Sequence, residues 1–208
     1  MPPITPVLKP RKTPVQARSV ATVDAIMEAT IQVLGTDGIK DLTTTKVADR
    51  AGVSVGSLNQ YFPNKESLLA GVLERYLDGV TDTLERTCAA LHGEPIAVMA
   101  RTLAIAYVDC KLARPEPSRA LYAVATELGS ASIVRKMCRR GDTAIRAMLE
   151  TAADATFDDL DTVTTVLQGV MSGPLQRVLG FGSKLKVKPL REQMALAAVA
   201  YLEAAASR

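Results

Sequence analysis

The chain has 208 residues, with 25 Lys and Arg against 22 Asp and Glu, which gives a formal net charge of +3. Apolar residues make up 48% of it, a share that excludes general disorder. No apolar run reaches the roughly 20 residues that span a bilayer, and the first residues lack the continuous apolar segment of a secretory signal. Three scattered cysteines fit neither a disulfide framework nor a zinc ribbon. We therefore expect a cytoplasmic protein that does not associate with membranes.

The single histidine, His92, limits the enzyme chemistry that is available. A Ser-His-Asp triad or a site with several histidine ligands would have to include it. It precedes Gly93, which is typical of the left-handed residue after a helix, so a histidine at a helix end is the better interpretation. We expect no catalytic residue, no metal site and no cofactor, and therefore no enzyme.

Residues 1–14 contain five prolines and the basic residues Lys9, Arg11 and Lys12, with no acidic residue. Proline at this density blocks helix formation, so the segment is predicted to be a disordered arm. Its charge is also compatible with an arm that contacts nucleic acid phosphates or enters a minor groove.

Through most of the remaining chain, apolar residues recur every three or four positions, which predicts helices. The first carries the stripe Val23, Ile26 and Leu34 and is predicted to stop before Gly35 and Gly38. Further helices are predicted at 66–91, 95–114, 118–128, 131–153, 158–181 and 187–206, with a kink or a break at Gly173-Pro174 in the fifth of these. The helix at 95–114 is apolar nearly all round, so it should be buried. The predicted fold class is all-α, with about nine helices.

Residues 43–62 have the pattern of two short helices joined by a tight turn. A threonine caps the first helix, and its inner face is formed by Val47 and Ala48. Gly52 can supply the left-handed backbone that turns the chain within three residues, and Ser54 then caps the second helix. Helix, glycine-containing turn and helix is the steric pattern of the helix-turn-helix.

The second of these helices, at about 54–62, is anchored on its inner side by Leu58 and Phe62. No acidic residue lies between Val53 and Asn64. A helix that approaches a polyanion avoids carboxylates and carries groups that donate hydrogen bonds. An ordinary helical corner could have the same apolar pattern, but the polar outer face and the basic arm favour DNA binding. That outer face consists of Gly56, Ser57, Asn59 and Gln60.

The sequence resembles the TetR family of bacterial transcriptional regulators over about residues 19–73. The resemblance is carried by Leu42-Thr43-Thr44, by the segment from Val47 to Leu58, and by Tyr61-Phe62-Pro63-Asn64-Lys65-Glu66-Ser67-Leu68. It implies a three-helix DNA-binding domain, which we place at 15–63 after the arm. It also implies a larger helical domain at 64–208 that binds a small effector and dimerises.

The family pattern implies DNA-binding roles for nine residues. Those directed toward base edges are Val55, Gly56 and Asn59. Those near the phosphate backbone are Thr44, Thr45, Ser57, Gln60, Tyr61 and Lys65. The family usually carries a tyrosine at position 59, whose contact an asparagine cannot reproduce. Either Asn59 hydrogen-bonds a base directly, which we favour, or the affinity depends more on Tyr61, Lys65 and the arm.

An effector pocket between helices should have apolar walls with a few polar groups. The candidate lining residues are Met99, Leu103, Tyr107, Cys110, Tyr122, Thr126, Met137, Met148 and Met171. Ordinary core packing is the competing interpretation for each, since methionine fills gaps in any core. The spread of methionines and the scarcity of aromatic residues favour a small, apolar effector.

The last two predicted helices offer a surface for an isologous four-helix interface in a homodimer. Its apolar candidates are Val163, Val166, Leu167, Val170, Leu190, Met194, Ala198, Tyr201 and Leu202. A further group, Arg135, Lys136, Arg139 and Arg140, is interpreted as a solvated basic face, and a site for an anionic effector or a further DNA contact is the less favoured alternative.

The sequence therefore predicts a ligand-responsive repressor. As a homodimer it would bind a palindromic operator in double-stranded DNA, and a small-molecule effector would release it. A regulator without an effector, or an activator, is the alternative, and a helical enzyme is a less favoured one.

Overall fold

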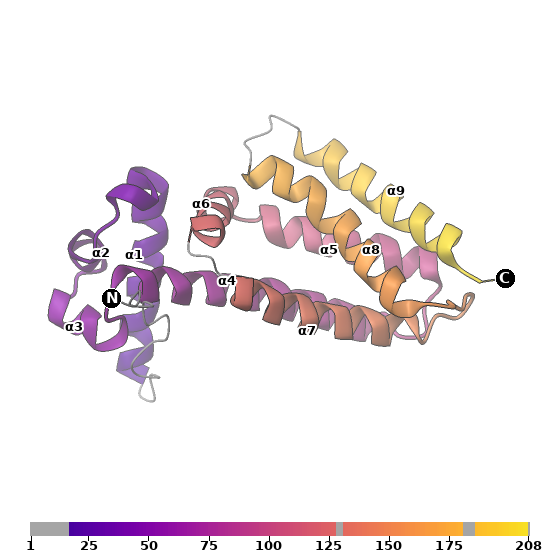
Figure 1. Ribbon diagram of the computed structural model, residues 1–208, viewed down its shortest axis with the longest axis horizontal. Helices are drawn as coiled ribbons and strands as arrows, with labels where there is room; N and C mark the ends of the chain where they lie inside the picture. Colours follow the sequence, from indigo (N-terminus) through magenta and orange to yellow (C-terminus); the bar gives the residue numbers. More distant parts are fainter. Residues whose placement is uncertain (1–16, 128–130, 181–185, 208) are drawn as a thin grey trace, which may run out of the picture. The chain divides into compact units, whose positions relative to one another are not determined.

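The structure, a computed structural model, describes residues 17–127, 131–180 and 186–207. Within these ranges the chain forms α-helices and one π-helical turn, and its one β-type pairing joins Thr156 to Ser207. The all-α prediction is confirmed (Figure 1). The helices are α1 (Ala17–Asp41), α2 (Thr44–Ala51), α3 (Val55–Tyr61), α4 (Lys65–Ala90), α5 (Ile96–Leu112), α6 (Pro115–Glu127), α7 (Ala131–Leu149), α8 (Leu160–Leu175) and α9 (Val187–Ala205). No helix in the described ranges has an apolar stretch long enough to cross a bilayer. The arm predicted at 1–14 lies outside the described residues.

The end of α1 differs from its prediction. The helix continues through Gly35, and its backbone leaves the helical region only at Gly38, with φ 77° and ψ 173°. Gly35 is exposed and remains helical at the modest entropic cost of a glycine, about 0.5–1 kcal/mol. A glycine alone therefore does not end a helix.

The predicted break at Gly173-Pro174 takes the form of a change in helix type. Proline lacks the N–H that an α-helix needs. α8 nevertheless continues to Leu175, one residue beyond Pro174, and then passes into a π-helical turn at Gln176–Gly180. Wider turns of this kind accommodate local disruptions of the α-helical hydrogen-bond ladder.

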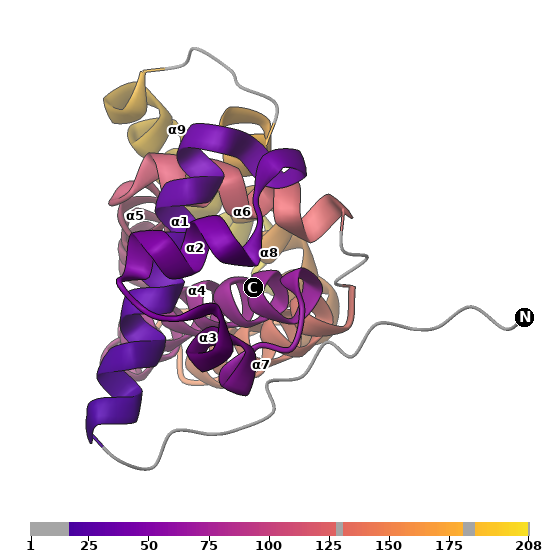
Figure 2. The same ribbon diagram turned by 90° about the vertical axis from the view of Figure 1, so that its left-hand side faces the viewer.

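The described chain divides into two compact units. The first contains α1, α2, α3, the part of α4 up to Tyr76, and the part of α6 from Arg119. α1 packs against α2 and α2 against α3, as Figure 2 shows with this unit turned toward the viewer. Its core includes Ile26, Leu34, Leu42, Val47, Ala48, Leu58, Phe62, Leu69 and Leu73.

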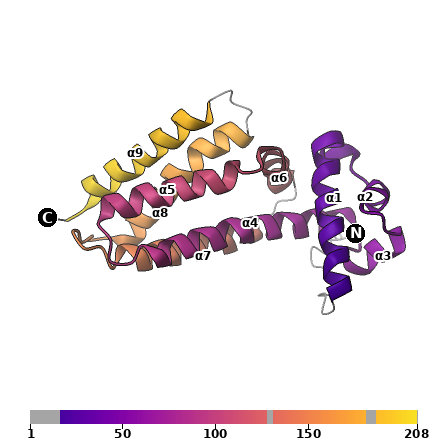
Figure 3. The ribbon, with the colours of Figure 1, turned by 180° about the vertical axis from the view of Figure 1, so that it is seen from behind.

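The second unit contains the part of α4 from Leu77, together with α5, α7, α8 and α9. α5 packs along α9, and α8 lies beside α9 (Figures 1 and 3). The prediction that the helix at 95–114 is buried holds for one side of α5, which contributes Met99, Leu103, Ala104 and Val108 to the core, whereas Val98 and Asp109 are exposed. The same helix also buries a lysine, Lys111.

Candidate functional site

The turn between α2 and α3 forms as predicted. Thr43 caps α2 by accepting a hydrogen bond from Lys46 N on its side-chain oxygen at 3.2 Å. Gly52 adopts the left-handed conformation, with φ 67°, and the next residue, Val53, donates from its N–H to Ala48 O at 3.0 Å. Left-handed backbone strains a residue that has a Cβ, so this position favours glycine.

The start and the inner side of α3 also agree with prediction. Ser54 Oγ accepts a hydrogen bond from Ser57 N at 3.0 Å, which satisfies a free N–H of the first turn. Leu58 and Phe62 are almost fully buried and fix the helix to its unit. Ser57 Oγ lies 2.8 Å from Ser54 Oγ, so the hydroxyl predicted to face a phosphate already takes part in the cap.

The opposite face of α3 is exposed to solvent. Gly56, Asn59 and Gln60 are exposed, whereas Val55 and Tyr61 are half-buried. The two amide side chains thus lie on the surface, where each can donate and accept hydrogen bonds. This is the chemistry that reads adenine in a major groove.

The first turn of α4 is fixed by a reciprocal cap. Asn64 Oδ1 accepts from Ser67 N at 2.7 Å, and Ser67 Oγ accepts from Asn64 N at 3.2 Å. Asn64 is therefore the N-cap of α4, and the helix begins at Lys65. The Lys65 ammonium donates to Lys40 O at the end of α1, at 3.2 Å.

Gly71 on α4 allows a close contact that the sequence analysis missed. A Cβ at this position would lie 2.8 Å from Cε1 of the Phe62 ring. The absence of a side chain therefore lets α4 pack directly on the residue that ends α3. The available signal was an isolated glycine inside a strong helical pattern, which often has a packing reason.

The first turn of α2 holds the two threonines of the prediction, with Thr44 half-buried and Thr45 exposed. Next to them, the Lys46 ammonium donates to Asp37 Oδ2 at 2.6 Å and to Asp41 O at 3.1 Å. The hydrogen bond between Lys46 and Asp37 lowers the pKa of the Asp37 carboxyl and raises the pKa of Lys46. Both groups line an open depression between α1 and α2, formed by Val33, Asp37, Lys46, Asp49 and Arg50. The sequence analysis did not identify it.

The effector candidates divide between the two units. Four of them share the continuous core of the second unit, Tyr107 packs against that core, and Met137 is buried on α7. Cys110 is half-buried, with its sulfur 3.8 Å from Thr83 Oγ1. Tyr122 and Thr126 belong to the stretch of α6 in the first unit, and the Thr126 side chain lies outside the described residues. The four shared-core residues are Met99, Leu103, Met148 and Met171.

Buried polar groups in the second unit escaped the sequence analysis. Thr164 Oγ1 is buried with no hydrogen-bond partner in the described part of the chain. Lys111 is only 4% exposed, and burial lowers its pKa to about 8. Its ammonium lies 5.8 Å from the centre of the Tyr107 ring. Burial likewise raises the pKa of the Cys88 thiol to about 12.

His92 is exposed, and Gly93 after it is left-handed with φ 80°, as the helix-end interpretation predicts. Gly93 N donates to Thr151 Oγ1 at 3.0 Å. Among the described residues, no group of three or more His, Cys, Asp or Glu is placed to hold a metal ion.

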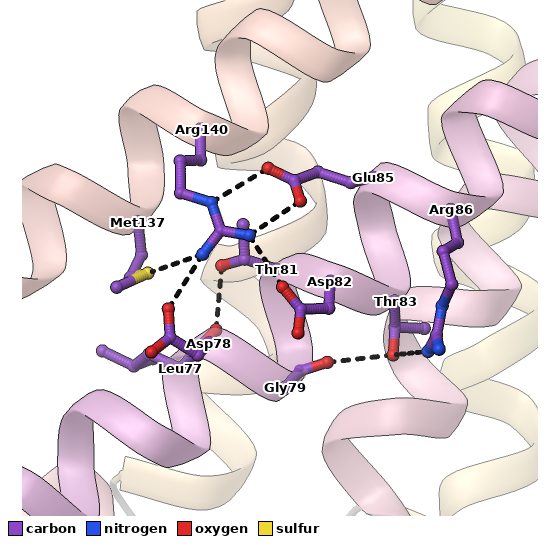
Figure 4. A network of polar contacts seen from close by, with 10 residues as sticks. All are labelled: Leu77, Asp78, Gly79, Thr81, Asp82, Thr83, Glu85, Arg86, Met137 and Arg140. Carbon is purple, nitrogen blue, oxygen red and sulfur yellow. Dashed lines mark hydrogen bonds and ion pairs between the residues drawn. The ribbon is translucent and has the colours of Figure 1, made fainter. Parts of the chain in front are cut away.

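The basic group on α7 is not entirely a solvated face, which corrects the prediction for Arg140. Its guanidinium binds Glu85 with two hydrogen bonds, at 2.9 and 2.7 Å, and also contacts Asp82 at 2.7 Å and Asp78 at 2.8 Å (Figure 4). The three carboxylates lie on one face of α4, at spacings of four and three residues. The planar guanidinium of Arg140 thus links α7 to α4 through several N–H donors. Arg135, Lys136 and Arg139 are exposed, as predicted.

Most of the residues predicted for a dimer interface are buried inside the second unit, which corrects their assignment. They form the inner stripes of α8 and α9, which pack against each other and against α5. A side chain used in the chain's own core is not available to a partner. The buried ones are Val163, Leu167, Leu190, Met194, Ala198 and Leu202, whereas Val166 is exposed and Val170 and Tyr201 are half-buried.

Two family profiles match the chain. The profile described as "Bacterial regulatory proteins, tetR family" matches residues 26–72, and the one described as "Tetracyclin repressor-like, C-terminal domain" matches residues 95–202. The second match alone covers about half of the chain.

Curated relatives match part of the chain. The nucleoid occlusion factor SlmA of Vibrio campbellii is 35% identical over an alignment of 81 residues, and the match covers 33% of this chain and 41% of SlmA. The transcriptional repressor KstR of Mycobacterium tuberculosis is 35% identical over 65 residues, 31% of this chain and 30% of KstR. The matches thus span less than half the length of either relative.

The fold itself is found in solved structures. A TetR family transcription regulator from Marinobacter aquaeolei superimposes with a TM-score of 0.66 at 22% identity, over 92% of this chain and 98% of the other. At this identity the likeness concerns the arrangement of helices.

Proposed function

The chain belongs to the TetR family of bacterial regulatory proteins, and on this premise we propose that it is a homodimeric transcriptional repressor of the cytoplasm. It binds a palindromic operator through α3 and leaves it when a small, apolar effector binds the second unit. Functionally, residues 1–14 are the arm, 15–63 the DNA-binding domain, and 64–208 the effector-binding and dimerisation domain.

The observation that carries DNA binding is the exposed face of α3. It presents Asn59 and Gln60 to solvent, and no carboxylate lies between positions 53 and 64 to repel a phosphate backbone. Leu58 and Phe62 hold the helix from its other side. A rigid helix with donors on its free face is suited to a major groove.

The homodimer is supported by the outer surface of α8 and α9. Val166 is 41% exposed and Leu196 is 53% exposed, and the two helices lie side by side. One recognition helix reads few base pairs, so two of them, about 34–36 Å apart, match two half-sites of a palindrome. Sedimentation velocity should give a dimer that Val166→Glu and Leu196→Glu dissociate. Val98→Glu on α5, which is also 41% exposed, is the matched control.

The effector site is supported by the core that Met99, Leu103, Met148 and Met171 share. Thioether side chains adapt to ligands of different shape, and apolar walls favour an apolar ligand. A thermal-shift screen of metabolites, followed by release of the protein from its operator, tests this. A protein that keeps its operator in the presence of every stabilising compound would be a regulator without an effector.

The decisive experiment selects duplexes from a randomised DNA pool and measures binding by fluorescence anisotropy. Asn59→Ala should weaken discrimination among sequences by about 1–3 kcal/mol. Lys65→Ala should weaken binding to all sequences alike and lower the salt slope by about 0.9. A purified protein that ignores double-stranded DNA at low salt would refute the proposal, and an unchanged footprint for Asn59→Ala would refute base reading by Asn59.

A further inference from the structure

The C-terminal end of α1 gathers two ammonium groups from two different helices. Lys46 of α2 donates to Asp41 O at 3.1 Å, and Lys65 of α4 donates to Lys40 O at 3.2 Å. Because Lys40 and Asp41 are consecutive residues, the two lysines meet on neighbouring carbonyls of one helix end. Sequence positions 46 and 65 give no sign of this arrangement.

The two carbonyls lie beyond a break in the helix. The backbone of α1 leaves the helical region at Gly38, so Lys40 and Asp41 do not continue the helix that precedes it. Carbonyls at the end of a helical segment have no partner within it, and here they accept from the two lysines. Each lysine uses one N–H donor on its carbonyl, and because an ammonium has three N–H donors, each keeps a donor for another acceptor.

The two lysines differ in one respect. Lys46 also forms an ion pair with Asp37 Oδ2 at 2.6 Å. Its side chain is nevertheless 49% exposed, and it lies in the first turn of α2, beside Thr44 and Thr45. A phosphate that approaches this turn meets the backbone N–H groups of a helix start together with the Lys46 ammonium.

We infer that Lys46 is a second contact to the DNA backbone, paired with Lys65 by the end of α1, and that Asp37 competes with the phosphate for its ammonium. The inference rests on the proposed function, in which Lys65 contacts DNA. In the free protein, the Asp37 carboxylate accepts a hydrogen bond from the ammonium that would bind a phosphate oxygen. When DNA binds, the ammonium is shared, and the attraction between Lys46 and the phosphate is reduced.

The competing interpretation is that the pair only joins α1 to α2. In that case Lys46→Met and Asp37→Asn would both loosen the first unit, and neither would change the salt dependence of DNA binding. The two interpretations therefore predict opposite effects for Asp37→Asn. Competition predicts tighter binding, and a purely structural joint predicts weaker binding or no change.

The test measures binding of the full-length protein to a labelled random-sequence duplex across a series of KCl concentrations. Lys46→Met should weaken binding several-fold at low salt and lower the slope of log K against log[salt] by about 0.9, the value for one phosphate contact. The matched control is Arg50→Met, which removes the same charge from α2 one turn further on, where Arg50 contacts Gln32 Oε1 at 3.4 Å. Equal slopes for the two variants would overturn the inference.

A second pair of variants tests the competition. Asp37→Asn should tighten binding several-fold and steepen the salt slope, and it should have no effect in a chain that also carries Lys46→Met. Asp49→Asn removes the same charge from the same depression and is the control. Equal effects of the two Asp→Asn changes would show that the change in DNA affinity follows the net charge alone, and would refute the role of Asp37.

Three outcomes separate this inference from the proposed function. If the wild type fails to bind DNA, or if Lys65→Ala leaves the salt slope unchanged, the proposed function fails. If Lys65→Ala lowers the slope and Lys46→Met does not, only the present inference fails. Lys46→Arg keeps the charge and should retain the slope, so a loss of slope in that variant also counts against it.

Discussion

The helix-turn-helix of α2 and α3 is held by contacts between close neighbours in sequence, whereas the second unit is held by contacts between distant ones. Thr43 bonds to Lys46, and Ser54 bonds to Ser57. In the second unit, Arg191 of α9 binds Asp109 of α5 through two hydrogen bonds across 82 positions. One region of the chain is therefore determined by hydrogen bonds between residues close in sequence, and the other by packing between residues far apart in sequence.

The largest expected effect lies in the second unit and concerns Lys111. Burial lowers its pKa from 10.5 to about 8. Below about pH 8 the folded and unfolded states both hold the proton, and the cost of burying the ammonium is fully present. Between pH 8 and 10.5 the unfolded state binds more protons, so stability rises with pH, by on the order of 3 kcal/mol in total.

Lys111→Met isolates this contribution from other groups that titrate at high pH. Denaturant unfolding measures the free energy of unfolding of both proteins. The variant should lack the increase that Lys111 provides, so the difference in free energy of unfolding between variant and wild type should change between pH 8 and 10.5 and be constant on either side. A difference independent of pH would show that the buried lysine has an ordinary pKa.

The next effect concerns a glycine of the first unit. In Gly71→Ala the new Cβ would meet the Phe62 ring at 2.8 Å, and overpacking should reduce stability by about 1–3 kcal/mol. Gly79→Ala on the same helix has open space and should instead stabilise by about 0.5–1 kcal/mol. Equal effects of the two substitutions in chemical denaturation would contradict the close contact of α4 with Phe62.

The turn itself can be tested with no change in packing. A Cβ at Gly52 would meet no atom of another residue beyond its chain neighbours within 4 Å, so Gly52→Ala acts through backbone conformation and should cost about 1–2 kcal/mol. Gly35→Ala, in the helical part of α1, should raise stability by about 0.5–1 kcal/mol. Hydrogen exchange in α2 and α3 should increase in the first variant and not in the second. A neutral Gly52→Ala would mean that the turn does not depend on left-handed backbone.

The smallest effect concerns Arg140. Arg140→Met leaves Asp78, Asp82 and Glu85 without their shared guanidinium and should destabilise by about 1 kcal/mol at low salt, because partly exposed ion pairs contribute little. The loss should shrink as NaCl is added. Arg139→Met, at the exposed neighbouring position, should change little. A loss in Arg140→Met that does not respond to salt would indicate packing rather than charge.

The sequence predicted the parts of the molecule that depend on local chemistry. Ser54 was identified as a cap and Gly52 as the turn because the hydrogen bond and the dihedral angle that they serve lie within a few residues. The same reasoning misplaced the end of α1 at Gly35, because a helix ends where its backbone is diverted, not wherever glycine occurs.

Other features depend on contacts that no local pattern records. Arg140 was interpreted as solvated because its partners lie 55–62 positions away. Lys111 was not singled out on an apolar helix, and inner and outer stripes of α8 and α9 could not be told apart, since both are rich in small apolar residues. Periodicity shows that a helix has an apolar face and does not say which neighbour covers it.

The three free cysteines differ in a way that provides an internal chemical probe. Cys88 is buried, Cys110 is half-buried, and Cys138 on α7 is exposed. Burial raises the pKa of Cys88 to about 12 and also raises the pKa of Cys138. Cys138 is nevertheless accessible to an alkylating reagent in the folded chain, whereas Cys88 reacts only after its surroundings open. The time course of alkylation at Cys88, followed by mass spectrometry with Cys138 as the internal standard, would therefore measure how fast this core opens in the wild-type protein.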